Sequence, residues 1–167
     1  VLFGLMSGVG NDLFDPDGMT TRAMLVSILY RMAGEPDVSE LPETPFEDVG
    51  PDAWYADAVR WAYANEVAAG IDDTHFAPDD RLTRAQLVTM LYRAYGPEKG
   101  VRPRPIGGYT DWNTVPEWAY PAATWAVSMG LLYGMSSSQL SPNAGANRAQ
   151  LAAFMMRTCE LQSELDA

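Results

Sequence analysis

The sequence is poor in the residues that most often build catalytic and metal centres. Among its 167 residues there is one cysteine, Cys159, and one histidine, His75. A single cysteine excludes an internal disulfide and a zinc site made of paired cysteines. His75 stands beside Asp72 and Asp73, a group that we interpret as a solvated loop. Because no GxSxG, HExxH or phosphate-loop motif occurs either, we expect no catalytic residue, no metal site and no cofactor.

Basic residues are also scarce. Eleven Lys and Arg residues face 22 Asp and Glu residues, which gives a formal net charge of −11. Nucleic-acid binding needs many basic side chains to neutralise phosphates, so a nucleic-acid partner is excluded. No apolar run approaches the ~20 residues that span a bilayer, so no membrane insertion is expected. The hydrophobic content of 47% is that of an ordinary folded domain.

Three segments of the sequence align with one another without gaps. They are GVGNDLFDPDGMTTR, GIDDTHFAPDDRLTR and GMSSSQLSPNAGANR, which begin at Gly8, Gly70 and Gly134. Each segment has Phe or Leu six residues after the glycine and Pro two residues later, and each ends with an arginine. These arginines are Arg22, Arg84 and Arg148, at spacings of 62 and 64 residues. Such agreement at fixed offsets indicates an internal repeat.

A first helix is predicted upstream of this loop in the second and third repeats. Trp54 and Trp61 are seven residues apart, and Trp118 and Trp125 repeat this spacing. Apolar residues at helical spacing predict a helix over residues 52–66 and a counterpart in the third repeat. We expect Trp61 and Trp125 in the core. Trp54 and Trp118 stand at helix starts beside a loop, where core packing and ligand contact fit equally well.

A second helix is predicted after each loop. Side chains typical of an N-cap precede it in every repeat: Thr21, Thr83 and Asn147. Gln86 and Gln150 stand three residues after their caps and complete a capping box, whereas Met24 interrupts the box of the first repeat.

The three arginines occupy the first position of these second helices, where a cation opposes the helix dipole. One interpretation is an anion site in each repeat, made of free backbone N–H groups and a guanidinium. The alternative is an ion pair with a loop acid, for which Asp15, Asp17, Asp79 and Asp80 are available. The third loop contains no acid, yet Arg148 is present there.

The combined pattern resembles the S-layer homology domain family of bacterial cell-surface proteins. Residues 46–96 resemble a full unit, with the signature Leu82-Thr83-Arg84-Ala85-Gln86. The third repeat is similar at Asn147–Gln150, and the first only in its second half, at Thr21–Met24. The resemblance implies an all-α fold with three helix-loop-helix repeats in a pseudo-threefold arrangement.

The repeats are expected at residues 1–35, 46–96 and 109–160, with linkers at 36–45 and 97–108. The first helix of the first repeat would fall before Val1. We therefore expect an apolar trough that is filled by a partner chain or self-association, by Val1–Phe3, or by residues outside this sequence.

The resemblance further implies a non-covalent anchor that binds a secondary cell-wall polysaccharide on peptidoglycan, often one with a pyruvyl ketal. The protein would then be extracellular, at the cell wall or S-layer. The arginines would meet the ketal carboxylate, the outer tryptophans would pack near the sugar, and the glycines would let the backbone approach the ligand. The expected carbohydrate-binding residues are Arg84, Arg22, Arg148, Trp54, Trp118, Gly70, Gly8, Gly134 and Thr83.

Departures from the family pattern leave two other functions open. Signature residues are replaced by Met24 in the first repeat and by Leu140 and Asn147 in the third. The second repeat has no such replacement, so its arginine, Arg84, lies in the best-preserved site. One alternative is a protein-interaction or S-layer assembly module whose grooves no longer bind sugar. Another is that the segment anchors a larger enzyme while having no catalytic activity itself.

Overall fold

The structure is a computed structural model that describes residues 4–8, 11, 13–96 and 108–165. Its helices are α1 (Arg22–Met32), α2 (Ala56–Ala64), α3 (Arg84–Tyr95), α4 (Tyr120–Ser128) and α5 (Arg148–Leu165), with short 3₁₀ turns η1 (Trp112–Thr114) and η2 (Glu117–Ala119). Across these described ranges the extended backbone is limited to isolated bridges, and no strand forms. The prediction of an all-α fold is confirmed. None of the described helices is both long enough and apolar enough to cross a bilayer.

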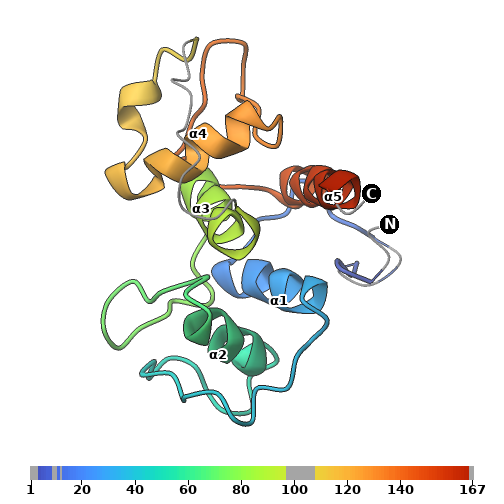
Figure 1. The fold of residues 1–167 in the computed structure, drawn as a ribbon, viewed down its shortest axis with the longest axis vertical. Coiled ribbons are helices and arrows are strands. Elements are labelled where there is room, and N and C mark those ends of the chain that lie inside the picture. Colours follow the sequence, from blue (N-terminus) through green and yellow to red (C-terminus); the bar gives the residue numbers. More distant parts are fainter. Residues whose placement is uncertain (1–3, 9–10, 12, 97–107, 166–167) are drawn as a thin grey trace.

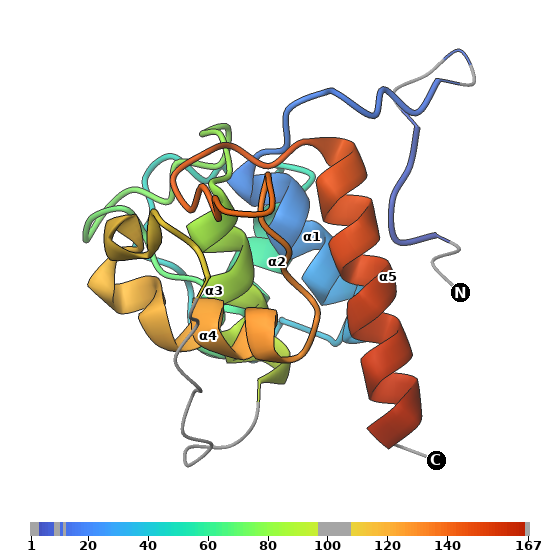
Figure 2. The same ribbon diagram turned by 90° about the horizontal axis from the view of Figure 1, so that it is seen from above.

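The helices form an inner and an outer set (Figure 1). The second helices of the three repeats are α1, α3 and α5. Figure 1 shows α1 and α3 in the middle of the molecule and α5 to their right. Helix α2 packs on the outer side of α1, and α4 packs in the same way on α3. Each outer helix therefore covers the inner helix of the preceding repeat. Figure 2 shows that α5 continues well beyond the ends of its neighbours.

The segments that lead into the three inner helices meet at the centre of the fold. The backbone N–H of Leu82 donates to Thr20 (2.9 Å), that of Ala146 to Leu82 (2.9 Å), and that of Thr20 to Ala146 (3.3 Å). All three residues are buried. The three hydrogen bonds close a ring, so each repeat is joined to both others at its most buried point.

The predicted N-caps are confirmed in all three inner helices. The Thr21 hydroxyl accepts a hydrogen bond from the Met24 N–H (3.3 Å). Thr83 and Gln86 form the complete capping box, at 3.2 and 3.1 Å. Asn147 and Gln150 form the same reciprocal pair, at 2.8 and 3.2 Å.

The predicted limits of the first helix in the second repeat were too wide. Helix α2 begins at Ala56 because two consecutive turns precede it, closed by Ala53 N–H to Gly50 (3.0 Å) and Ala56 N–H to Ala53 (2.9 Å). It ends at Ala64, and Glu66 then adopts a left-handed φ of 57°. Trp54 consequently lies before the helix and not in its first turn.

The two groups of tryptophans differ in burial. Trp61 and Trp125 are 8% and 7% exposed, which confirms their predicted place in the core. Trp54 and Trp118 are 65% and 54% exposed. Core packing is therefore excluded for this outer pair.

Candidate functional site

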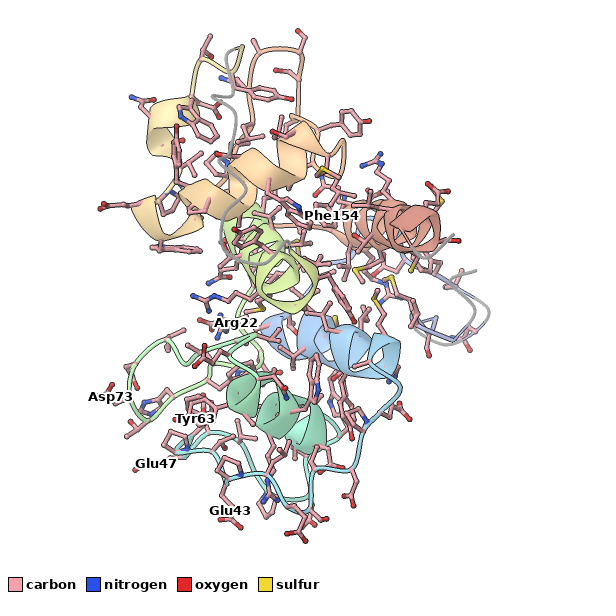
Figure 3. All side chains as sticks on the ribbon, in the orientation of Figure 1. Arg22, Glu43, Glu47, Tyr63, Asp73 and Phe154 are labelled. Carbon is pink, nitrogen blue, oxygen red and sulfur yellow. The ribbon has the colours of Figure 1, made fainter. Side chains whose placement is uncertain are left out.

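Arg22 lies where α1, α3 and the loop of the second repeat meet (Figure 3). Its side chain is buried, and its Nε donates to the Phe76 carbonyl (2.8 Å) while Nη2 donates to the Ala69 carbonyl (2.7 Å). The guanidinium carbon also lies 4.6 Å from the centre of the Phe76 ring. The arginine of the first repeat therefore holds the loop of the second.

The same contact recurs at the other two boundaries between repeats. The hydrogen bonds run from Arg84 to the carbonyls of Leu140 (3.1 Å) and Tyr133 (2.5 Å), and from Arg148 to those of Phe14 (2.8 Å) and Ser7 (2.5 Å). The second repeat thus holds the third, and the third holds the first. The three arginine contacts form a closed cycle around the molecule.

The backbone N–H groups at the start of each inner helix are also engaged. Arg22 N–H donates to the Asp80 carbonyl (3.1 Å) and Ala23 N–H to the Pro78 carbonyl (3.0 Å). In the same way, Arg84 N–H donates to the Ala144 carbonyl and Ala85 N–H to the Pro142 carbonyl. Arg148 N–H donates to the Gly18 carbonyl and Ala149 N–H to the Pro16 carbonyl. The prediction that these N–H groups are free was wrong, because the next repeat supplies carbonyl acceptors for them.

The alternative of an ion pair with a loop acid was also wrong. No carboxylate of the described residues lies within ion-pair distance of Arg22, Arg84 or Arg148. Burial lowers the pKa of Arg22, and the charges of Asp80 and Asp48 oppose that shift only in part. The guanidinium groups are desolvated, and backbone carbonyls replace water as their acceptors.

A groove opens beside Arg22, and we call it the Trp118 groove. Its cavity volume is about 350 Å³. It is lined by Arg22, Ala69, Gly70, Ile71, Gln86, Thr89, Met90, Arg93 and Trp118. All three repeats contribute, with Arg22 from the first, Gly70 and Gln86 from the second, and Trp118 from the third. The structure therefore brings together an arginine, a glycine and an outer tryptophan that the sequence predicted as site residues.

A second groove, the Trp54 groove, contains the equivalent residues one repeat earlier. Its volume is about 230 Å³, and it is lined by Leu5, Met6, Ser7, Gly8, Thr20, Met24, Ser27, Ile28, Arg31, Trp54, Arg148 and Leu151. Met24 and Ile28 replace Gln86 and Met90, so this groove lacks the side-chain amide that lines the Trp118 groove. Within the described part of the chain, the buried Ser27 hydroxyl has no hydrogen-bond partner.

The third boundary, around Arg84 and Gly134, is arranged differently. Arg157, the counterpart of Arg93, lies 4.5 Å over the Tyr133 ring, and the Gln150 amide contacts the Met135 sulfur at 3.0 Å. The counterparts of Arg157 and Gln150, which are Arg93 and Gln86, line the Trp118 groove. At the third boundary, Arg157 and Gln150 instead contact neighbouring side chains. The signature Leu82–Gln86 is thus divided: Gln86 lines the Trp118 groove, while Arg84 holds the loop of the third repeat and Thr83 caps α3.

The glycines have a packing role inside their own loops. A Cβ on Gly70 would lie 2.6 Å from the His75 carbonyl and 2.7 Å from the Phe46 ring. A Cβ on Gly134 would lie 2.5 Å from the Tyr109 ring. Both positions exclude a larger residue before any ligand is considered.

Replacing Gly70 with alanine is expected to lower the free energy of unfolding by about 1–3 kcal/mol, because the added methyl group overlaps backbone and an aromatic ring. Gly50→Ala is the matched control, since a Cβ there would meet no atom within 4 Å. Urea denaturation of both variants measures the difference. Equal stability of Gly70→Ala and Gly50→Ala would refute the packing role.

Two aspartates that the sequence analysis did not single out hold the loops in shape. The Asp48 carboxylate accepts hydrogen bonds from the N–H groups of Phe76 (2.8 Å) and Ala77 (2.7 Å). Asp111 does the same for Leu140 (2.8 Å) and Ser141 (2.7 Å). The signal was present, because Phe46-Glu47-Asp48 is echoed by Tyr109-Thr110-Asp111. These carboxylates position the carbonyls that the arginines bind.

The stabilisation due to Asp111 is expected to depend on pH. The two N–H donors lower the pKa of its carboxyl in the folded state. The stabilisation is therefore complete above the pKa of unfolded aspartate, about 4, and is lost as the pH falls through the folded pKa. We expect Asp111→Asn to lower Tm at neutral pH and the deficit to shrink in acid. Thermal denaturation measured over a range of pH values tests this prediction. Asp73→Asn is the control, and its Tm should match that of the wild type at each pH.

Comparison with known proteins gives a family and several relatives. A family model, the S-layer homology domain, matches residues 45–88 and 108–152. The chain is 31% identical over 164 residues to a surface-layer 125 kDa protein of Lysinibacillus sphaericus, covering 94% of this chain and 13% of that protein. It is 31% identical over 144 residues to an endoglucanase of Bacillus sp. strain KSM-635, covering 85% of this chain and 15% of that protein.

A third relative is a cellulosome-anchoring protein of Acetivibrio thermocellus. The identity is 24% over 165 residues, which covers 93% of this chain and 35% of that protein. The chain thus spans between 13% and 35% of the length of these three relatives.

Proposed function

The chain belongs to the S-layer homology domain family, and from this premise we propose that it is an extracellular module that anchors a protein to the bacterial cell wall. Relatives that are named as surface-layer and cellulosome-anchoring proteins support this role. The module binds and does not catalyse. The endoglucanase relative fits this division, because this chain matches only 15% of it.

The ligand is a secondary cell-wall polysaccharide with an acidic substituent such as a pyruvyl ketal. The observation that carries this proposal is the recurrence of one arrangement in the Trp118 and Trp54 grooves: an arginine, a glycine and an exposed tryptophan from three different repeats. An exposed indole face suits a sugar ring, and a guanidinium suits a carboxylate. Arg84, Gly134 and Thr83 belong to the third boundary, where the Arg157 guanidinium already lies over the Tyr133 ring.

Charge supports the same placement. Four of the eleven basic residues line the two grooves, Arg22 and Arg93 in one and Arg31 and Arg148 in the other. The rest of the chain is strongly acidic. Since charges beyond about 8 Å are largely screened at physiological salt, an acidic sugar meets the local arginines and not the net charge of the protein.

The architecture behind these grooves is a set of three tandem repeats in a pseudo-threefold arrangement, at residues 1–35, 46–96 and 109–160. Within the described residues, the first repeat contributes the inner helix α1. The closed cycle of arginine contacts and the ring at Thr20, Leu82 and Ala146 support this arrangement.

Trp118→Ala is expected to weaken binding to purified cell-wall sacculi by about tenfold, because it removes an exposed aromatic face without disturbing the core. Co-sedimentation with sacculi, before and after removal of the secondary polymer, measures this. Tyr63→Ala removes another partly exposed aromatic residue outside both grooves and should bind like the wild type. Unchanged binding by the double variant Trp54→Ala/Trp118→Ala would refute the groove proposal.

The protein-interaction alternative gives a different result in the same assay. The third boundary favours it in part, because Arg157 and Gln150 already have partners within the protein. An S-layer assembly module would bind an assembled surface layer and ignore bare sacculi, whether or not these carry the polymer. Sedimentation with both materials separates the two functions.

A further inference from the structure

The two grooves differ at one buried position of their inner helices. Ser27 of α1 and Thr89 of α3 each follow the first helical arginine by five residues, and each lines its own groove. Both are buried, at 5% and 6% exposed. The Thr89 hydroxyl donates to the Ala85 carbonyl one turn back (2.8 Å), whereas the Ser27 hydroxyl has no partner among the described residues. An unpaired buried hydroxyl is costly, and a ligand that brings an acceptor atom into the groove would remove that cost.

Alkyl and thioether side chains line the same groove as this hydroxyl. Met24 and Ile28 belong to α1, like Ser27, and Leu151 reaches the groove from α5. Ligand sites of this kind combine an apolar lining with a few polar groups that fix the orientation of the ligand. A hydroxyl donor beside alkyl groups suits a small substituent that joins a carbonyl oxygen to an alkyl group, which is an acyl group.

Three other polar side chains of the Trp54 groove already have partners. The Thr20 hydroxyl donates to the Ala146 carbonyl (2.7 Å), and Arg148 donates to two backbone carbonyls as described above. Arg31 donates to the Leu5 carbonyl (3.2 Å), and its Nε lies 3.8 Å from the Glu35 carboxylate. An acidic substituent would have to compete with Glu35 for Arg31, whereas a neutral substituent would not.

We propose that the two grooves bind different saccharide units, and that the Trp54 groove selects a neutral sugar that carries an O-acyl ester. The Ser27 hydroxyl donates to the ester carbonyl, the alkyl end of the acyl group packs on Met24 and Ile28, and the exposed indole covers the sugar ring. An ester fits better than an amide, because the carbonyls of Leu5 and Ser7 already accept from arginines and an amide N–H would have to share an acceptor. This assignment rests on the polysaccharide-binding function proposed above, and it leaves the acidic unit to the Trp118 groove.

The probes for the first test are methyl glycosides of N-acetylglucosamine with a single O-acetyl group, one regioisomer at a time. The parent glycoside without the ester is the matched control, and it also carries an amide. In calorimetric titrations of the full chain, at least one ester is expected to bind about tenfold more tightly than the parent, because it adds a hydrogen bond and a buried methyl group.

Variants of the full chain then assign this preference to a groove and to a hydroxyl. Ser27→Ala should reduce the preference for the ester by about fivefold, the value of one hydrogen bond. Thr89→Val should leave the preference unchanged, because the Thr89 hydroxyl is engaged by Ala85. Trp54→Ala should abolish ester binding, and Trp118→Ala should not affect it.

The stability of the unliganded chain gives an independent readout of the Ser27 hydroxyl. Ser27→Ala removes a buried hydroxyl without a partner, so its Tm is expected to equal or exceed that of the wild type. Thr89→Val breaks the bond to Ala85, so its Tm should fall. A fall in Tm for Ser27→Ala would mean that the hydroxyl already has an acceptor, such as the Ala23 carbonyl one turn back, and would overturn the proposal.

Two further results would overturn the proposal. One is equal affinity for the esters and the parent glycoside, or no binding of any of them. The other is a preference for the ester that Ser27→Ala does not change. The anchoring function is judged separately, by sedimentation of Trp118→Ala with sacculi, because the acidic unit is assigned to the other groove. Binding to sacculi that depends on Trp118 would leave the anchoring function standing if the glycosides fail.

Discussion

Arg22→Met is expected to lower the free energy of unfolding by about 3 kcal/mol, because hydrogen bonds from a charged donor each contribute about 1.5–3 kcal/mol. Methionine keeps most of the apolar stem but leaves the carbonyls of Phe76 and Ala69 without their donors. The bond to Phe76 is buried, so water cannot fully replace the guanidinium there, whereas the bond to Ala69 is only partly buried. Urea denaturation at neutral pH measures the loss, with the m-value as a check on two-state behaviour.

Arg93→Met is the matched control for this prediction. Arg93 lines the same groove but is exposed, and the described residues provide no hydrogen-bond acceptor for its side chain. We expect the free energy of unfolding of Arg93→Met to match that of the wild type within about 0.5 kcal/mol, as for most surface substitutions. If both variants were equally stable, the carbonyl contacts of Arg22 would contribute nothing to folding, and its burial would need another explanation. The pair also separates binding from folding, since only Arg93→Met can weaken ligand binding without unfolding the module.

Phe76→Ala is the second change with a large expected effect, a loss of about 3–5 kcal/mol. Phe76 is fully buried, its ring centre lies 5.5 Å from that of Phe46, and the Arg22 guanidinium covers its face. Alanine removes the ring from both contacts and leaves a cavity under the loop of the second repeat. Thermal and urea denaturation should both report the loss.

Phe14→Ala tests the same repeat position in a different environment. Phe14 is 39% exposed, although the Arg148 guanidinium lies 4.8 Å from its ring centre. We expect a loss of about 1 kcal/mol, since a partly exposed ring loses less apolar burial. A loss as large as that of Phe76→Ala would mean that burial does not determine the effect. Arg22→Met and Phe76→Ala should not be additive, because the two side chains are in contact.

Local features of the fold could be predicted from the sequence. The repeat fixed which residues are equivalent, the cap side chains marked the starts of α1, α3 and α5, and the inner tryptophans lie in the core as expected. The conclusions on caps and tryptophans depend on residues within about two helical turns of one another, the range over which helix periodicity and capping act.

The arginine contacts could not be predicted, because their partners are distant backbone carbonyls. The Arg22 bonds join residues 54 and 47 positions apart, and any residue type can supply a carbonyl acceptor. For the same reason the contact of Arg84 with the loop of the third repeat could not be read from its signature. The signature Leu82–Gln86 is continuous in sequence, but its side chains serve two different boundaries in space.

The cyclic arrangement of the arginines affects how the module folds. In a linear repeat protein each unit contacts only its neighbours, so the ends can fray independently and stability grows unit by unit. Here the Arg148 bonds connect residues 134 and 141 positions apart, which ties the last repeat to the first. Such long-range contacts must form against the chain entropy of a very large loop, so they slow folding relative to an open helical array. Once formed they leave no terminal repeat, and a pulling force on one end must break both boundaries of the repeat that it extends, because each repeat is joined to the other two.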